Sequence, residues 1–176
     1  MTKKCKIIEH PHSLLRTTSA PIVDFDNGLR DLLDKLAATL GGSHQPGIGL
    51  AAVQIGVPKR VVLADVAGDE PSGGVLELIN PQIIHASSER GAHMEGCLSM
   101  PEVWLTLSRP KKVTIGYFDR FGKEKELTVT DYCSAVVQHE MDHMDGTLII
   151  DHVSPLKRKM ALGKLKKHQK NQRVGR

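Results

Sequence analysis

The stretch Gln138-His139-Glu140-Met141-Asp142-His143 contains a His-Glu-x-x-His pattern, and the periodicity of residues 131–144 predicts a helix around it. Residues four apart lie on one face of a helix, so the imidazoles of His139 and His143 can converge on one metal ion. Glu140 follows the first histidine and can act there as a general base without being a ligand. The stretch therefore predicts a metal-binding helix with a proton-transfer group.

The same five-residue pattern also arises by chance, so its surroundings matter. Tyr132 and Val136 fall on the helical face that carries His139 and His143. This arrangement predicts that both histidines point inward. Two inward histidines one turn apart seldom both find ordinary core partners, which favours the metal site.

Two histidines leave a tetrahedral site short of one protein ligand. The upstream segment Glu95-Gly-Cys-Leu-Ser99 offers the thiolate of Cys97, with Gly96 beside it to permit close approach. We expect Ser99-Met-Pro101 to end this segment as a turn. The alternative for Cys97 is a buried structural cysteine, an interpretation that also suits Cys133 on the predicted helix.

A third segment, Gly47-Ile48-Gly49-Leu-Ala-Ala-Val-Gln54, combines glycines and small residues that let a backbone come close to another group. The alternative is a glycine-rich turn leading into a short helix. Gln54 lies in an apolar run and needs a hydrogen-bond partner if it is buried. A carbonyl oxygen under attack would be such a partner.

Strands in the middle of the chain and helices at both ends indicate an α+β fold. Hydrophobic periodicity predicts a first helix. Alternating apolar and polar residues or β-branched runs predict the strands, and the second strand ends at Pro81. A last helix begins at Ser154-Pro155 and packs through Leu156, Met160 and Leu165. The first helix covers residues 28–40, the strands cover 60–66, 75–80, 112–117 and 126–130, and a hairpin turn covers 119–122.

The charge of the 176 residues is unevenly spread. Residues 157–176 hold nine of the 24 Lys and Arg and no Asp or Glu, so the other 156 residues carry 15 basic and 20 acidic side chains. We expect one domain, with a catalytic body at residues 1–156 and a basic C-terminal helix and tail at residues 157–176. A non-enzymatic alternative for the chain is a nucleic-acid-binding module built on this basic tail, although the tail lacks aromatic residues for base stacking; a solvated end is the other interpretation of the tail.

No stretch approaches the roughly 20 apolar residues of a membrane-spanning helix, and the N-terminus has no apolar signal core. Cys5, Cys97 and Cys133 are odd in number and far apart, which is typical of free thiols in a reducing compartment. We therefore expect a cytoplasmic protein without a membrane partner.

Taken together, the three segments resemble the peptide deformylase family. The family pattern is Gly-x-Gly-Leu-Ala-Ala-x-Gln, then Glu-Gly-Cys-Leu-Ser, then Gln-His-Glu-x-Asp-His, and residues 47–54, 95–99 and 138–143 match it in order. The resemblance covers about residues 5–165. It implies small antiparallel sheets packed around a central metal-binding helix, with one helix near each terminus.

The resemblance also implies an activity and a cofactor. The family removes the formyl group from the formyl-methionine of newly made proteins and releases formate. Cys97, His139 and His143 would hold one divalent ion, with a water in the fourth place. That ion would be Fe(II) natively, with Zn(II), Ni(II) or Co(II) as substitutes, as the soft thiolate ligand suggests.

Roles for individual residues follow from the same resemblance. Glu140 would take a proton from water and pass it to the leaving amine. Gln54 and the backbone N–H of Leu98 would stabilise the oxyanion. Ala135, Val136 and His139 are the candidates for the methionine pocket. The other expected substrate contacts are Gly47, Ile48, Gly49, Gly96 and Trp104.

Trp104 is a departure from the family, because many relatives carry Arg three residues after the proline that stands here as Pro101. The Arg lies near the path of the substrate backbone. Trp104 would instead stack on the substrate or cover the rim of its pocket.

The expected partners are formyl-methionyl nascent peptides and, through the basic tail, the ribosome; we expect a monomer. The rival enzyme class is a zinc peptidase of the His-Glu-x-x-His type, whose third ligand would come from downstream, at Asp151 or His152. Glu95 and Arg109 are expected to form a solvated ion pair rather than a buried brace.

Overall fold

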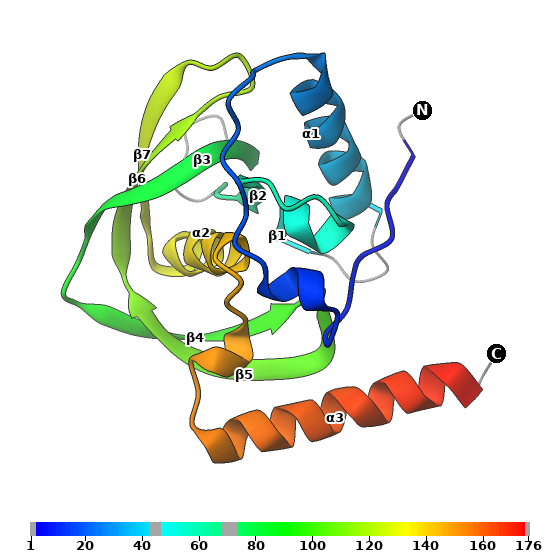
Figure 1. The fold of residues 1–176 in the computed structure, drawn as a ribbon. Helices are drawn as coiled ribbons and strands as arrows, with labels where there is room; N and C mark the ends of the chain where they lie inside the picture. Colours follow the sequence, from blue (N-terminus) through cyan, green and yellow to red (C-terminus); the bar gives the residue numbers. More distant parts are fainter. Residues whose placement is uncertain (1–2, 43–46, 68–73, 175–176) are drawn as a thin grey trace.

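The computed structural model describes residues 3–42, 47–67 and 74–174 (Figure 1). The α+β class and the arrangement of small antiparallel sheets around one helix are confirmed. The helices are α1 Asn27–Leu40, α2 Asp131–Met144 and α3 Pro155–Val174, with short 3-10 turns η1 Ser13–Arg16, η2 Ala52–Ile55 and η3 Ile149–Asp151. The strands are β1 Gly49–Ala51, β2 Val61–Asp65, β3 Val75–Ala86, β4 Arg90–Cys97, β5 Met100–Pro110, β6 Lys112–Phe118 and β7 Glu124–Thr130.

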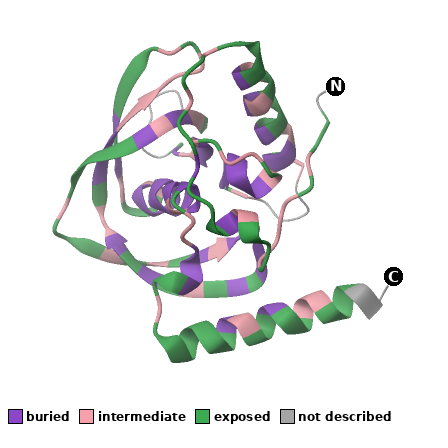
Figure 2. Cartoon of the chain, in the orientation of Figure 1, coloured by how far each residue is buried: buried purple, intermediate pink, exposed green. Residues whose placement is uncertain are grey.

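Helix α2 lies at the centre of the molecule, and Figure 2 shows it as almost entirely buried. Val136, His139 and His143 are buried, as their shared helical face predicts. Tyr132, on the same face, is 55% exposed and lines the cavity described below. Just past the helix, Gly146 has a φ of 71°, a conformation that glycine adopts most easily.

Five antiparallel strands form the main sheet, in the order β1-β2-β3-β6-β7. Strand β3 does not end at Pro81, as the sequence suggested, but continues to Ala86. The pairing with β6 shifts between Ile79 and Gln82, so Pro81 falls in an irregularity of the ladder. Proline is tolerated there because the missing N–H is not required by the partner strand.

Strands β4 and β5 form a separate two-stranded sheet that the sequence did not predict. The connecting turn is at Leu98 and Ser99, whereas the expected turn reached Pro101, which already belongs to β5. This tight hairpin places Cys97, the last residue of β4, beneath α2. The hairpin therefore determines where the candidate thiolate lies.

The terminal helices pack against the outside of this core. Asp26 caps the start of helix α1, because its carboxylate accepts a hydrogen bond from Leu29 N at 3.0 Å, and the helix buries a leucine stripe as predicted. Helix α3 packs through Leu165, as predicted, and through Ala161. The other two residues predicted to pack are exposed: Leu156 is 69% exposed and Met160 is 60% exposed. They lie one residue, or about 100° around the helix, away from the buried stripe.

In the described part of the chain, no helix combines the length and apolar character needed to cross a membrane.

Candidate metal centre and catalytic site

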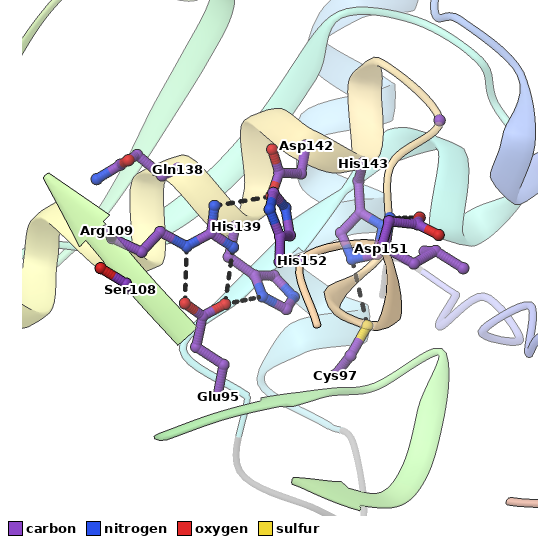
Figure 3. A network of polar contacts seen from close by, with 12 residues as sticks. Glu95, Cys97, Ser108, Arg109, Gln138, His139, Asp142, His143, Asp151 and His152 are labelled. Carbon is purple, nitrogen blue, oxygen red and sulfur yellow. Dashed lines mark hydrogen bonds and ion pairs between the residues drawn. The ribbon is translucent and has the colours of Figure 1, made fainter. Parts of the chain in front are cut away.

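Three side chains from two elements meet under α2. Cys97 comes from the end of β4, and His139 and His143 come from successive turns of α2 (Figure 3). One ligand atom from each residue lies within 4.8 Å of the other two, and Cys97 Sγ is 3.2 Å from His143 Nε2. The spacing on the helix and the tight β4–β5 turn thus bring together the three predicted ligands.

This donor set fits a divalent transition metal. One thiolate and two imidazoles form the mixed sulfur and nitrogen set that zinc and iron accept, and three protein ligands leave a fourth position open. Glu140 lies next to the cluster with Oε2 buried and without a hydrogen-bond partner among the described residues. A buried carboxylate oxygen of this kind suits a polar group bound beside the ligands.

The electrostatics of the two histidines also favour a cation. Burial alone would lower the pKa of His139, but hydrogen bonds and charges from Cys97 and Glu95, with the charge of Glu140, raise it well above its ordinary value. The pKa of His143 is lowered by burial and by the charge of His139. The two imidazoles are therefore not both protonated in the cluster, and His143 is kept in the neutral form that a metal ligand requires.

Arg109 and Glu95 form a buried ion pair, so the expectation of a solvated pair is wrong. They are 5% and 8% exposed, and the guanidinium donates to both carboxylate oxygens at 2.7 and 2.9 Å. Arg109 also donates to Asp142 Oδ2 at 2.8 Å. Because alternate residues of a strand share a face, both side chains of the β4–β5 hairpin point at α2.

This pair extends directly to His139, one of the three candidate metal ligands, as Figure 3 shows. Glu95 Oε2 lies 2.9 Å from His139 Nδ1, which leaves the Nε2 edge of His139 for the ligand cluster. Burial would raise the pKa of Glu95, but Arg109 and His139 lower it to about 2. Glu95 thus stays ionised and fixes the orientation of His139. The sequence reasoning missed Arg109 and Asp142 as parts of the site, although Asp142 lies only three residues after His139 on the helix.

Gln54 is 1% exposed and already has partners within the protein. Its Oε1 accepts from Ala51 N at 2.8 Å, while Nε2 donates to Ser99 Oγ at 3.1 Å and approaches Cys97 Sγ at 3.8 Å. Ser99 is fully buried and was not predicted as a site residue. Its hydroxyl holds the Gln54 amide at the edge of the cluster.

A cavity of about 470 Å³ opens onto the cluster. Cys97, His139, Glu140, Gln54 and Leu98 line it, whereas His143 lies deeper. The expected substrate contacts line it as well: Gly47, Ile48, Gly49, Gly96, Trp104, Ala135 and Val136. Further residues that line the cavity were not predicted from the sequence, among them Met94, Glu102 and Tyr132.

Glu140 faces this cavity from α2 and is 5% exposed. Its pKa is raised to about 7, mainly by burial; the charges of Glu95 and Asp142 also raise it, whereas those of His139 and Arg109 lower it. A carboxylate with a pKa near neutrality can both accept and return a proton, as general acid–base catalysis requires.

Two positions beside the site require glycine, because neighbouring side chains leave no room for a Cβ. A Cβ on Gly49 would lie 2.7 Å from Cγ and Cδ of Glu140, so any side chain there would displace the carboxylate. A Cβ on Gly96 would lie 2.8 Å from the ring of Trp104, which is 62% exposed and covers this part of the rim.

The downstream ligands of the rival peptidase interpretation lie elsewhere. Asp151 forms ion pairs with Arg16 and Arg158, and His152 Nε2 lies 2.7 Å from Asp142 Oδ2. Among the described residues, neither belongs to the cluster of possible ligands, whose third member is Cys97.

Comparisons with known proteins agree with this geometry. Residues 4–159 match the family model of polypeptide deformylase. A peptide deformylase of Bartonella tribocorum is 40% identical over 166 residues, covering 93% of this chain and 92% of the relative. A crystal structure of a peptide deformylase from Legionella pneumophila has a TM-score of 0.88 and 38% identity, covering 97% of this chain and 98% of that one.

A second solved structure, the peptide deformylase of Ehrlichia chaffeensis in complex with actinonin, has a TM-score of 0.87 and 34% identity over 94% of this chain and 98% of that one. The residues matched by the family model include the glycine-rich segment, the β4–β5 hairpin and helix α2. The chain belongs to the peptide deformylase family, a group of hydrolases that remove the N-formyl group from newly made peptides.

Proposed function

We propose that this deformylase acts on formyl-methionyl N-termini, with Glu140 as its proton-transfer group beside an ion held by Cys97, His139 and His143. The observation that carries the proposal is the buried carboxylate of Glu140, which faces the cavity next to the ligand cluster with one oxygen unpartnered among the described residues. When bound, a divalent ion supplies a Lewis acid that makes water nucleophilic near neutral pH.

Glu140 accepts a proton from the water that attacks the formyl carbon. As the C–N bond breaks, Glu140 returns that proton to the methionine nitrogen, which leaves as the amine. The new C–O bond leaves as formic acid, which gives its remaining proton to the released amine through solvent and becomes formate, and the Glu140 carboxylate is ionised again. The pKa of Glu140, raised by burial to about 7, suits both transfers.

Gln54 and the backbone N–H of Leu98 stabilise the negative charge that develops on the formyl oxygen. Both residues line the cavity beside Cys97, and Ser99 fixes the Gln54 amide. Removing one such donor typically costs about 2.7–4 kcal/mol of transition-state stabilisation. Glu95, held by Arg109, acts as a positioning residue through His139.

The methionine side chain enters the part of the cavity formed by Ala135 and Val136, next to His139. The peptide backbone then passes along Gly96 and the segment from Gly47 to Gly49, which line the same cavity. Trp104 covers the rim over the following residues.

The proposed native ion is Fe(II), with Zn(II), Ni(II) or Co(II) as substitutes. The Cys97 thiolate favours these softer ions over magnesium or calcium, but a thiolate beside iron is open to oxidation. We expect the activity of the iron form to decay in air while that of the nickel form persists. Repeated assays of both forms over hours in air would measure this, and equal lifetimes would contradict it.

The cellular setting is also part of the proposal. The enzyme works as a cytoplasmic monomer, with residues 1–156 as the catalytic body and residues 157–176 as a basic helix and tail of the same domain. Nine basic residues in that tail support contact with the ribosome, where formylated peptides emerge. If removal of the tail left co-sedimentation with ribosomes at low salt unchanged, the contact would be ruled out.

The direct test is formate release from a formyl-Met tripeptide by protein purified without oxygen. Glu140→Gln is the matched variant, because it keeps the size of the side chain and removes its ability to carry the proton. We expect release by the parent alone at equal metal content. Equal release by both would exclude Glu140 as the proton carrier, and no release by a fully loaded parent would exclude this substrate.

A further inference from the structure

A second groove lies beside the catalytic cavity, between β5 and α3. Its volume is about 260 Å³, and it shares Val103 and Trp104 with the cavity that holds the ligand cluster. Helix α3 runs along β5 in Figure 1, so the groove continues from the rim of the catalytic cavity toward this helix. Trp104 is therefore a wall common to both spaces.

The α3 side of the groove is apolar at its centre and positively charged at both ends. Met160 is 60% exposed and is flanked by Lys157 and Lys164, which are exposed and form no ion pair within the described part of the chain. The residues that line the groove include no acidic side chain. Such a surface suits a chain with apolar or small side chains and separated negative charges.

We propose that this groove binds the segment of the substrate that follows its first three residues, and that it favours acidic side chains there. The inference rests on the proposed function, because a formyl-methionyl chain with its formyl group at Glu140 must leave the cavity past the rim. Trp104 lies on that rim and also lines the groove. The occupant is thus the downstream part of the same peptide.

The spacing of the two lysines indicates which residues they contact. Lys157 and Lys164 are seven residues apart on a helix, or about 10.5 Å along its axis. A peptide in the polyproline II conformation has three residues per turn and rises about 3.1 Å per residue, so side chains three residues apart lie on the same face and are separated by about 9.3 Å. Acidic residues at positions 4 and 7 of the substrate match this spacing.

The test compares three substrates of the metal-loaded enzyme: formyl-Met-Ala-Ala, formyl-Met-Ala-Ala-Glu-Ala-Ala-Glu, and the heptapeptide with Lys in place of both Glu. We expect similar kcat for the two heptapeptides and a KM about threefold to tenfold lower for the acidic one. The double variant Lys157→Glu with Lys164→Glu should reverse this preference. Cleavage of the tripeptide should not change, since it ends before the groove.

The matched control is Lys159→Glu with Lys166→Glu, a pair with the same spacing on α3 whose exposed side chains line neither space. It changes the net charge equally and should keep the preference of the parent. Equal effects of both double variants would show a general electrostatic effect of net charge and would overturn the groove assignment. Equal KM values of the parent for the two heptapeptides would also overturn it. A parent that fails on the tripeptide would overturn the proposed function itself, and the groove assignment with it.

Discussion

The two histidines of the candidate ligand cluster differ at the nitrogen that faces away from the cluster. His139 Nδ1 lies 2.9 Å from Glu95, and Glu95 is held in turn by Arg109. His143 Nδ1 has no hydrogen-bond partner among the described residues. The orientation of His139 is therefore the one that depends on a chain of buried charges, and this chain can be broken at a single residue.

Replacing Arg109 by Met should break this chain of buried charges. The substitution leaves the Glu95 carboxylate buried with only His139 as a charge partner, and loss of one member of a buried pair typically lowers the free energy of unfolding by about 3–5 kcal/mol. Loss of such support for a ligand also weakens metal binding by about 10- to 100-fold. Urea unfolding and metal titration measure the two effects.

Lys111→Ala is the control for this prediction, because Lys111 forms an exposed ion pair with Glu89 just beyond β5. It should leave both the free energy of unfolding and the metal affinity nearly unchanged. If Arg109→Met proved equally mild, the buried network would not support His139.

Gly49→Ala tests the close contact between β1 and Glu140. The added Cβ would overlap the Glu140 side chain, so the carboxylate must move, and a displacement of about 1 Å can lower kcat about 100-fold. Gly163→Ala is the control, because no atom lies within 4 Å of a Cβ at this position of α3. That variant should keep the parent kcat and raise the free energy of unfolding by about 0.5–1 kcal/mol. An unchanged kcat in Gly49→Ala would contradict the assigned role of Glu140 or its geometry.

At the scale of elements, local patterns predicted α1, α2 and the β6–β7 hairpin, since each carries its own periodicity and its own ends. The β4–β5 hairpin was missed because its inward positions include charged residues such as Glu95 and Arg109. These side chains become suitable for a core only when they meet each other and α2. The same reason explains the site: ligand spacing within α2 is visible in the sequence, whereas the support for His139 joins residues 14 to 44 positions apart.

The end of α2 offers a prediction for one element. Gly146 has a φ of 71°, and a Cβ there would lie 2.7 Å from the carbonyl oxygen of Arg16. Gly146→Ala should therefore lower the free energy of unfolding by more than the roughly 1–2 kcal/mol expected for a left-handed residue alone. Gly74→Ala separates the two causes, because Gly74 has a φ of 103° and no atom within 4 Å of its Cβ. Equal losses in the two variants, measured by urea unfolding, would show that the contact with Arg16 contributes nothing.

At the scale of the whole molecule, one carboxylate joins distant parts of the chain. Asp151 at the end of η3 forms ion pairs with Arg16 of η1 and Arg158 of α3, and it accepts a hydrogen bond from Leu148 N at 2.8 Å. The N-terminal segment, the turn after the catalytic helix and the basic C-terminal helix thus meet at Asp151. Its contribution to stability must depend on its charge.

Burial would raise the pKa of Asp151, but the hydrogen bonds from Arg16 and Leu148 N and the charges of Arg16 and Arg158 lower it below its ordinary value of 3.8. A carboxyl whose pKa is lower in the folded state stabilises that state above its unfolded pKa, and the stabilisation is lost as pH falls through the folded pKa. Asp151→Asn keeps an oxygen for Leu148 N and removes only the charge. We expect it to lower the free energy of unfolding by up to about 1 kcal/mol at pH 7, after allowance for solvent screening, and by progressively less below pH 3.8.

Urea unfolding of parent and variant at matched pH values between 7 and 3 measures this difference, and changes in metal binding with pH cancel because both proteins share one ligand cluster. Arg16→Gln identifies the partner, since Asp151→Asn made in that background should have a smaller effect at pH 7. A difference between parent and variant that stayed constant down to pH 3 would mean that the charge of Asp151 does not hold the three segments together. Their docking would then rest on apolar packing around Leu15 and Leu165, which are almost completely buried in the same cluster.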